Sequence, residues 1–462
     1  MGMRKSIAIN SAKLARLAVG AVGHEGTSLP GLVAEKIDPD LLTKLAKNNF
    51  SKGVIVVTGT NGKTTASKMI ADVMESQGIS FIRNQAGSNM PRGIITTILQ
   101  NSDSKGRCGA DMALFEVDEA YVPAVCQQLK PKIITVTNLF RDQLDRYGEL
   151  DSIATSFKKA FSSLEATLIL NADDPLVASL ATGLSKKPVF FGVSDYTGET
   201  IENDNTADSI FDSENGEKLQ YLQRYFGHIG IYTSKVSKFK RPTPNVELVK
   251  MHKLSKSSSN FDVKTSTLTQ NIHLKLPGLY NIYNSLAAYA VCKSINIDDK
   301  AIASSLASSK PAFGRGEELP FGKKRLQIML IKNPTGFNQI IQTFLKPKPQ
   351  TNPVLFCIND NIADGRDVSW LWDSALEDIA GYQGKVIVSG TRSYDMALRL
   401  KYAGFKSADI VIEPDIDQAI QKLLDSIKTG QLGYILPTYT AMLKARAIIS
   451  QKSGHLVKGI SQ

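Results

Sequence analysis

A short glycine-bearing segment near the start of the chain has the residue types that bind phosphate. It reads Gly59-Thr60-Asn61-Gly62-Lys63-Thr64-Thr65. Glycines let the backbone turn so that successive N–H groups point at anionic oxygens, Lys63 supplies a positive charge, and the Thr64 hydroxyl can ligate Mg²⁺. The leading glycine stands closer to the Gly-Lys pair than in the usual phosphate-loop pattern. The segment predicts an ATP site and does not say what the ATP is used for.

The neighbouring sequence supports this prediction. Residues 54–57 form a short apolar run typical of a buried strand, and residues 63–77 favour a helix. A GTPase is excluded because the chain lacks an [Asn/Thr]-Lys-x-Asp motif that reads guanine. A DNA-dependent motor stays an alternative, because residues 114–119 (LFEVDE) resemble the acidic pair of such motors.

A carboxylate after a second predicted strand, residues 112–117, is a candidate Mg²⁺ ligand. Glu116 lies at the carboxyl end of this strand. Ligands gather at such strand ends in open parallel sheets, and oxygen donors suit Mg²⁺. Glu116 is therefore expected to complete the Mg²⁺ site with Thr64, and Glu119 is the alternative ligand.

The elements that must position these residues alternate between strands and helices. Further strands are predicted at residues 132–137, 166–170, 326–331, 354–358, 385–389, 410–412 and 433–436. This alternation predicts an α/β fold in which helices cover both faces of a mostly parallel sheet. We expect a phosphate-loop central domain and a C-terminal Rossmann-like α/β domain.

Composition divides the 462 residues into three parts. Residues 1–50 are predicted to form a helical segment, residues 51–315 the ATP-binding domain and residues 316–462 the C-terminal domain. Within the second part, residues from about 196 to 265 are polar and predict an insertion of short antiparallel strands. Residues 311–320 are predicted to be the linker between the two larger domains.

Charge and hydrophobicity indicate where in the cell the protein is expected and which classes of partner it is expected to bind. Hydrophobic content of 42% and charged content of 21% describe a globular chain, and no apolar run approaches the ~18–20 residues of a membrane span. The basic N-terminus reads as an amphipathic helix rather than a secretion signal. We expect a cytoplasmic protein, held at most peripherally at the inner membrane face. The formal charge of +11 favours anionic partners, among which we expect nucleotide and phosphorylated substrate but no nucleic acid.

Several motifs resemble those of the Mur ligases, the ATP-dependent enzymes that assemble peptidoglycan stem peptides. Besides the phosphate segment and the strand ending in Glu116, they are residues 171–175 (NADDP) and 278–284 (GLYNIYN). Other segments resemble the MurT branch, which comprises the synthetase subunits of lipid II isoglutaminyl synthases. These segments are residues 13–16 (KLAR), 137–148 (TNLFRDQLDRYG), 332–336 (KNPTG) and 359–370 (NDNIADGRDVSW). The likeness runs from about residue 5 to about residue 445.

The resemblance implies a Mur-ligase-type central domain and an ATP-dependent amidation. The α-carboxyl of D-glutamate in the stem peptide of lipid II, or of its soluble precursor, is activated as an acyl phosphate and becomes D-isoglutamine. A GatD-like glutaminase subunit, expected in a heterodimer, supplies ammonia from glutamine. The sequence itself lacks a glutaminase site: Cys108 precedes a strand instead of following one on a tight elbow, and none of the five histidines lies in a motif for a base.

The resemblance also assigns roles to individual residues. Asn281 is expected to contact the nucleotide, with helix capping as the alternative. Arg315 is expected to reach the phosphates, which its guanidinium suits. Asp367 is expected to orient the partner's catalytic histidine as the third member of a Cys-His-Asp triad, and Asp360 and Asp364 are its rivals.

The insertion departs from the pattern of the family, in which many members carry a four-cysteine zinc ribbon. The matching positions here are Asp212, Asn215, Ser234 and Ser237. Structural zinc favours thiolate and imidazole ligands, so no zinc is expected. The number of Mg²⁺ ions stays open. Two alternative functions also stay open: an amino-acid-adding Mur ligase or folylpolyglutamate-synthetase-like ligase, and a non-enzymatic nucleotide-dependent adaptor.

Overall fold

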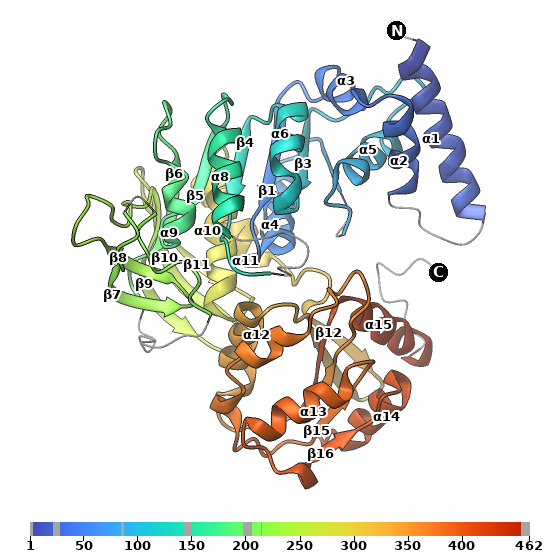
Figure 1. Cartoon of the computed structure of the whole chain (residues 1–462), viewed down its shortest axis with the longest axis vertical. Coiled ribbons are helices and arrows are strands. Elements are labelled where there is room, and N and C mark those ends of the chain that lie inside the picture. The colour runs from blue at the N-terminus through green and yellow to red at the C-terminus, as the bar shows by residue number, and fades with distance from the viewer. Residues whose placement is uncertain are drawn as a thin grey trace.

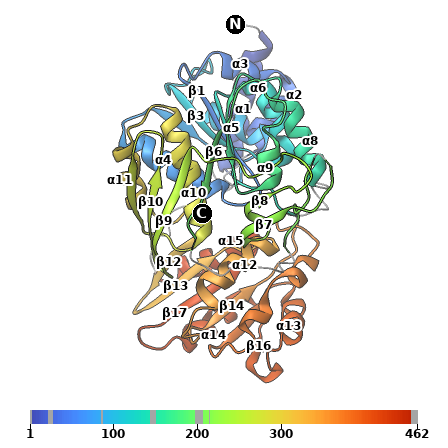
Figure 2. The ribbon, with the colours of Figure 1, turned by 90° about the vertical axis from the view of Figure 1, so that its left-hand side faces the viewer.

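The computed structural model describes residues 3–21, 28–84, 87–142, 150–196, 206–213 and 215–453, and every structural statement below concerns these residues. Their strands form a nine-stranded sheet, a six-stranded sheet and a two-stranded ribbon. Figures 1 and 2 show the nine-stranded sheet and its helices stacked above the six-stranded sheet. The order of the sheets along the chain follows the predicted order of the two domains, and the predicted boundaries at residues 50 and 315 stay predictions.

The nine-stranded sheet has the order β11-β10-β9-β6-β5-β4-β1-β3-β2. Strands β9 to β2 pair in parallel, whereas β9, β10 and β11 are antiparallel to one another. The bounds are β1 Gly53–Thr58, β2 Phe81–Arg83, β3 Met112–Glu116, β4 Ile133–Val136, β5 Thr167–Asn171, β6 Val189–Val193, β9 Val246–Leu254, β10 Ser259–Lys264 and β11 Thr269–Leu274.

Both faces of this sheet are buried, as the apolar run of β1 predicts. Ile55 and Val57 of β1 enter one core, and Val54 and Val56 enter the other, because successive side chains of a strand point to opposite faces. The helices of this part are α1 Met3–Ala21, α2 Leu29–Ile37, α3 Leu41–Lys47, α4 Lys63–Ser76, α5 Pro91–Gln100, α6 Val122–Leu129, α8 Leu150–Phe161, α9 Pro175–Ser179, α10 Leu279–Ser294 and α11 Asp299–Ser308, with the 3-10 turn η1 Glu119–Tyr121.

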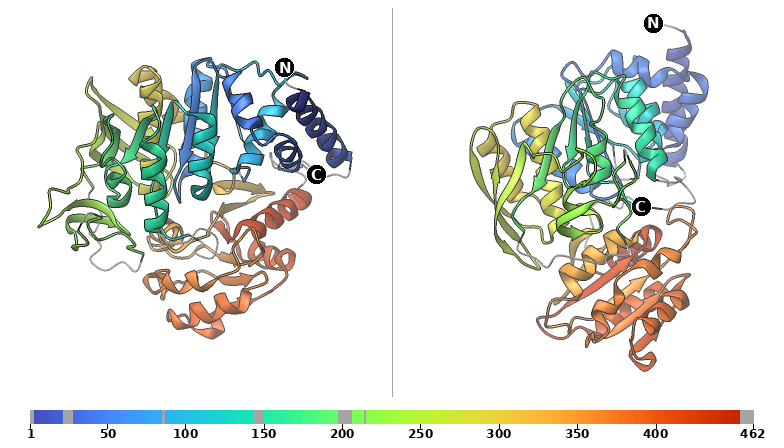
Figure 3. Two further views of the ribbon diagram at one scale, coloured as in Figure 1. Left: turned by 45° about the horizontal axis from the view of Figure 1, so that its top comes forward. Right: turned by 60° about the vertical axis from the view of Figure 1, so that its left-hand side comes forward.

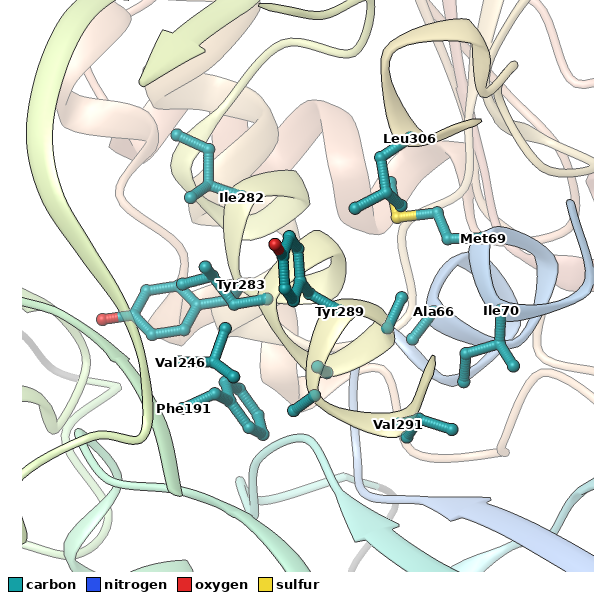
Figure 4. Close-up of a cluster of buried hydrophobic side chains, with 14 of the residues drawn as sticks. Ala66, Met69, Ile70, Phe191, Val246, Ile282, Tyr283, Tyr289, Val291 and Leu306 are labelled. Carbon is teal, nitrogen blue, oxygen red and sulfur yellow. The ribbon is translucent and has the colours of Figure 1, made fainter. Parts of the chain in front are cut away.

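Helix α10 is buried along most of its length and forms one wall of the candidate site described below. Its residues from Leu279 to Cys292 are buried with the exception of Tyr280. Figure 4 shows its side chains Ile282, Tyr283, Tyr289 and Val291 among residues of α4, α11 and the sheet. Because helix α4 begins at the phosphate segment, this packing holds that segment against the first turn of α10.

The six-stranded sheet has the order β12-β13-β17-β14-β15-β16 and is parallel except for β12. The strands are β12 Arg315–Phe321, β13 Lys324–Met329, β14 Val354–Cys357, β15 Val386–Ser389, β16 Ile410–Ile412 and β17 Leu432–Pro437. The helices and turns are α12 Pro334–Ile340, η2 Ile341–Leu345, η3 Ser369–Asp373, η4 Leu376–Ile379, α13 Ser393–Tyr402, η5 Ser407–Asp409, α14 Ile416–Ser426 and α15 Tyr439–Ser453. Parallel strands alternating with helices confirm the α/β class.

Two details differ from the sequence-based expectation. The predicted linker at residues 311–320 is wrong in its second half, because Arg315–Phe321 is strand β12 and pairs with β13. The predicted insertion is only partly separate, because β9 and β10 extend the large sheet and the ribbon consists of β7 Gln220–Phe226 and β8 Ile229–Thr233. Residues 197–205 and 214 of this insertion lie outside the described part.

A buried carboxylate, Asp173, connects β6, α10 and the segment that follows the ribbon. It accepts hydrogen bonds from the backbone N–H of Val193 at 2.7 Å, from the Tyr283 hydroxyl at 2.6 Å and from Arg241 Nε at 2.5 Å. A buried carboxylate is stable only when its oxygens are paired in this way. The second aspartate of the same motif, Asp174, caps α9 by accepting from the N–H groups of Leu176 and Val177.

Candidate functional site

A pocket of about 380 Å³ lies between the two sheets. The carboxyl ends of β1 and β3 point into it, as expected for a ligand site of an open parallel sheet. One side of its lining comes from the phosphate segment, residues 60–65, and from α10. The opposite side comes from the part that begins at β12, including Arg315, Lys332, Thr335 and Tyr439. The pocket therefore joins parts of the chain that are far apart in sequence.

The phosphate segment has the backbone shape that its glycines predict. Gly59 has φ +119° and Gly62 has φ +89°, which are conformations that side-chain-bearing residues rarely adopt. A Cβ atom on Gly62 would lie 2.1 Å from Asn284 Oδ1. Asn61 is fixed by Asn138, whose Oδ1 accepts the Asn61 N–H at 2.9 Å. Only glycine at position 62 allows this segment to turn beside α10.

Lys63 is buried at the first position of α4 and is held by acidic neighbours. Its Nζ donates hydrogen bonds to the Gly59 carbonyl at 2.7 Å and to Glu119 Oε2 at 3.0 Å, and Asp118 Oδ1 lies 3.6 Å away. Burial alone lowers the pKa of Lys63, but the charges of Glu119 and Asp118 outweigh burial and raise this pKa above its ordinary value. Lys63 is therefore a fixed positive charge.

Thr64 and Glu116 contact each other directly. The Thr64 hydroxyl donates a hydrogen bond to Glu116 Oε2 at 2.9 Å, and Glu116 is 3% exposed. Burial raises the pKa of Glu116 above its ordinary value, although the Thr64 hydrogen bond and the charge of Lys63 act in the opposite direction. The alternative ligand, Glu119, is paired with Lys63 instead. The geometry thus favours Glu116 as the carboxylate that shares a cation with Thr64.

Arg315, the first residue of β12, lines the pocket from the other side. No hydrogen bond or ion pair to its guanidinium is found among the described residues. Burial lowers the pKa of Arg315 below its ordinary value, and the charge of Glu116 opposes that change. A partly buried cation without a partner is poorly compensated unless an anion binds beside it. A phosphate group in the pocket would supply that anion.

Asn281 and Asn284 lie one helical turn apart at the start of α10, but only Asn284 lines the pocket. The Asn281 side chain donates to the Pro277 carbonyl at 2.7 Å and accepts from Asn284 Nδ2 at 3.4 Å. Neither bond caps the helix, whose first turn has no side-chain cap hydrogen bond, so Asn281 matches neither the capping alternative nor a residue that lines the pocket. Asn284 is the better candidate for a direct nucleotide contact.

The three aspartates of the loop after β14 have different surroundings. Asp360 accepts from the Thr391 hydroxyl at 2.8 Å and lies 3.7 Å from Arg392 Nε. Asp364 is 5% exposed and accepts the Thr440 N–H at the start of α15 at 2.7 Å.

Asp367, in contrast, is exposed. Its one hydrogen bond in the described part of the chain is from the Ser369 N–H, at 2.8 Å. Asp360 and Asp364 therefore have structural partners, whereas Asp367 presents a carboxylate to solvent.

The sequence alone predicts no role for Lys332 and Asn333, although their motif, residues 332–336, resembles that of the MurT branch. Lys332 lines the pocket and forms an ion pair with Asp142. The Asn333 side chain donates to Asn61 Oδ1 at 3.0 Å, so it connects the C-terminal part directly to the phosphate segment. Asp142 belongs to the motif of residues 137–148. The last part of that motif, residues 143–148, lies outside the described residues. The sequence holds one indication that Lys332 belongs to the site: it follows immediately after the predicted strand that ends at residue 331.

The four positions where zinc cysteines would stand lie between the bridged residues Phe211 and Lys218 and between Thr233 and Lys240. We refer to the described residues from 211 to 240 as the ribbon region. The Ser237 hydroxyl donates to Asp212 Oδ2 at 2.5 Å, and Ser234 Oγ accepts the Ser237 N–H at 3.1 Å. Asn215 accepts the Glu217 N–H at 2.9 Å. These oxygen and amide groups form hydrogen bonds and do not fit structural zinc. Within the described ranges, no group of three or more His, Cys, Asp or Glu residues is arranged to hold a metal ion.

None of the helices in the described ranges is both long and apolar enough to cross a bilayer.

Comparison with known proteins identifies the family. The Mur ligase middle domain matches residues 57–292, and the MurT ligase C-terminal domain matches residues 330–442. The chain is 35% identical to the lipid II isoglutaminyl synthase (glutamine-hydrolyzing) subunit MurT of Staphylococcus aureus (strain COL), over 95% of this chain and 96% of the relative. It is 31% identical to the subunit of the same name in Streptococcus pneumoniae, over 98% of each chain.

Solved structures share the fold at lower identity. A pseudomurein peptide ligase type C from Methanothermus fervidus aligns with a TM-score of 0.67 and 20% identity, covering 88% of this chain and 80% of that structure. MurF ligase from Thermotoga maritima in complex with ADP aligns with a TM-score of 0.62 and 14% identity, covering 91% and 84%. These likenesses bear on the fold alone, whereas the near-full-length identities show that the chain belongs to the MurT family of Mur ligases.

Proposed function

We propose that this chain is the synthetase subunit of a lipid II isoglutaminyl synthase. It uses ATP to convert the α-carboxyl of D-glutamate in the stem peptide into the amide of D-isoglutamine, with ammonia supplied by a separate GatD-like glutaminase. The observation that carries the proposal is the pocket that the phosphate segment and Arg315 line from opposite sides, with Glu116 hydrogen-bonded to Thr64 of that segment. Within the described part of the chain, the Arg315 guanidinium has no hydrogen bond or ion pair. The names of the relatives, which call them subunits, support the existence of a partner.

The residues of the pocket fit ATP and Mg²⁺. Backbone N–H groups of residues 62–65, Lys63 and Arg315 would hold the phosphates, and Asn284 would contact the nucleotide at the start of α10. Thr64 and Glu116 would ligate Mg²⁺ through oxygen atoms, which this ion prefers. When bound, Mg²⁺ neutralises phosphate charge and lowers the barrier to phosphoryl transfer.

The chemistry requires an activated carboxyl group. A carboxylate resists nucleophiles because it is negatively charged and has no leaving group. Transfer of the γ-phosphoryl group to one carboxyl oxygen gives an acyl phosphate, and attack by ammonia at the carbonyl carbon then expels phosphate. Lys63 and Arg315 stabilise the charge that develops on the phosphoryl oxygens, and Lys332 lies in the same pocket for the same task.

The cysteines support an external source of ammonia. Cys126, Cys292 and Cys357 are buried. Burial raises the pKa of Cys126 to about 12 and that of Cys292 and Cys357 further still, so their thiols are not nucleophiles at neutral pH. Cys108 precedes strand β3 and has no strand-to-helix elbow.

Asp367 is the residue that would act on the partner. Its exposed carboxylate and its single hydrogen bond within the described chain leave it able to reach a histidine of the glutaminase. A carboxylate there would hold the histidine tautomer and stabilise the imidazolium during glutamine hydrolysis. The complex is expected to be a heterodimer in the cytoplasm, at most peripherally attached to the membrane that holds lipid II.

One experiment separates this function from its alternatives. The chain is incubated with ATP and lipid II, and with either ammonia, an amino acid, or glutamine plus a GatD-like glutaminase, and the product is weighed by mass spectrometry. Amidation gives a product lighter by the difference between OH and NH₂, with ammonia or with glutamine plus the partner. Addition of an amino acid would indicate an amino-acid-adding ligase, and no product in any arm would indicate an adaptor.

A further inference from the structure

Helix α1 carries a row of exposed apolar side chains. Met3, Ile7, Leu14 and Leu17 are 80%, 50%, 67% and 71% exposed. Their spacings of four, seven and three residues place them on one side of the helix. Single exposed apolar residues are ordinary, but a row of four along one helix marks an interaction surface. We refer to these four residues as the α1 stripe.

The opposite side of α1 is already occupied by the protein. Ala8, Ile9 and Ala12 are at most 1% exposed and belong to the core beneath α2 and α5. Helix α1 is therefore fixed to the body of the protein while the α1 stripe faces outward. Figure 1 and the left panel of Figure 3 show α1 as the outermost helix beyond α5, at the edge of the sheet that ends in β2.

The charges on α1 indicate what the stripe contacts. The helix contains four basic residues, Arg4, Lys5, Lys13 and Arg16, and no acidic residue. Arg4 and Lys13 flank the stripe; Arg4 Nε donates to the Ile37 carbonyl, whereas the single side-chain nitrogen of Lys13 donates to the Ser102 and Asp103 carbonyls. Lys5 is buried on the inner side of the helix, so Arg4 and Arg16 are its exposed cations. An apolar row bordered by cations suits the boundary between acyl chains and anionic headgroups.

We infer that α1 docks the protein on an anionic lipid surface, with the α1 stripe in the headgroup region and the exposed Arg4 and Arg16 near lipid phosphates. The inference rests on the proposed function in one respect, since a lipid-linked substrate must be reached at a membrane. Helix α5 packs on α2, and the residues just before α5, Asn89 and Met90, line the pocket. Docking through α1 would thus hold the pocket near the bilayer while the stem peptide enters it.

The test uses the full chain and vesicles of equal parts phosphatidylglycerol and phosphatidylcholine, with binding measured by co-sedimentation. The variant Leu14→Gln/Leu17→Gln removes two stripe side chains without changing the charge. Its vesicle affinity is expected to fall about tenfold or more, because each buried leucine contributes strongly to partitioning. Binding of the unmodified chain should weaken as salt is raised and on vesicles of phosphatidylcholine alone.

The matched control is Leu222→Gln/Val236→Gln, which changes two residues of the ribbon region that are 84% and 70% exposed. It is expected to bind vesicles like the unmodified chain. Equal binding by the stripe variant and the unmodified chain, or an equal loss in the control, would overturn the inference. Dissociation of a dimer or of the glutaminase complex by the stripe substitutions, with vesicle binding retained, would also overturn it and identify a protein interface.

A soluble substrate separates this inference from the proposed function. With a muramyl-pentapeptide nucleotide and ammonia, the stripe variant should form amide at the rate of the unmodified chain, whereas with vesicle-embedded lipid II its rate should fall in parallel with binding. Vesicle binding that depends on the stripe, together with no amidation of either substrate by any form, would sink the proposed function and leave the docking surface standing.

Discussion

The hydroxyl of Thr64 and the carboxylate of Glu116 are joined by a hydrogen bond of 2.9 Å although the residues are 52 positions apart in sequence. The bond connects the first turn of α4 to the end of β3. Glu116 is fixed further by Asn84, whose Oδ1 accepts the Glu116 N–H at 2.9 Å. The parallel pairing of β1 and β3 therefore holds together the two residues that we propose as Mg²⁺ ligands.

The first prediction concerns Glu116. The variant Glu116→Gln keeps the shape of the side chain and removes its charge, so Mg²⁺ binding should weaken and ammonia-dependent amidation should fall about 100-fold or more. Because burial already disfavours the ionised form, we expect no loss of thermal stability. The control Glu318→Gln alters a carboxylate whose side chain is 50% exposed on β12. Equal rates for Glu116→Gln and the control would contradict the assignment.

The second prediction concerns Arg315. The variant Arg315→Ala should raise KM for ATP about tenfold or more, since it removes a cation that would contact the phosphates. The melting temperature should stay unchanged, because no protein partner of the guanidinium is lost within the described structure. Arg325→Ala, in the neighbouring strand β13, serves as the control. An unchanged KM accompanied by a large loss of stability would mean that Arg315 is a structural residue.

The third prediction concerns Asp367. In the complex with the glutaminase, Asp367→Asn should lower glutamine-dependent amidation about 10³- to 10⁴-fold while leaving ammonia-dependent amidation intact. The amide oxygen can still accept the Ser369 N–H, so the loop should keep its shape. Full glutaminase activity in this complex would refute the role of Asp367.

The two alternative candidates, Asp360 and Asp364, provide comparison variants for Asp367. Asp360→Asn should have little effect on either nitrogen source, because its partners, Thr391 and Arg392, lie on the same part of the chain. Asp364→Asn should lower stability instead, because Asp364 accepts both the N–H and the hydroxyl of Thr440 in the first turn of α15. A selective loss of glutamine-dependent activity in either variant would transfer the role to that residue.

The fourth prediction concerns the ribbon region. Metal analysis of the purified chain should find no stoichiometric zinc, because Asp212, Asn215, Ser234 and Ser237 supply no thiolate. The same four positions changed together to cysteine should retain zinc, since Ser237 already contacts Asp212. Zinc in the unmodified chain would contradict the prediction directly.

The sequence predicts local structure well and contacts between distant segments poorly. Strand β1 and helix α4 were recognisable because apolar runs and glycines act within a few residues. The sequence predicts a linker where strand β12 lies because its proline-bearing residues resemble a loop, and only pairing with β13 makes it a strand.

The candidate site also divides into features that the sequence predicts and contacts that it does not. The phosphate segment was identified from its own residues, and the pairing of Thr64 with Glu116 followed from the expected sheet. The contact between Asn333 and Asn61 bridges 272 positions and depends on how the two sheets meet, which no local pattern reports. The choice between Asn281 and Asn284 likewise depends on which side of α10 faces the pocket.

The most direct test of the central claim is the fate of a labelled carboxyl oxygen. Substrate carrying heavy oxygen in the α-carboxyl of D-glutamate is amidated with ATP and ammonia, and the released phosphate is analysed by mass spectrometry. Activation as an acyl phosphate predicts that one labelled oxygen is transferred to inorganic phosphate for each amide formed, with ADP as the other product. Amide formation with unlabelled phosphate, or with AMP and pyrophosphate, would contradict the account.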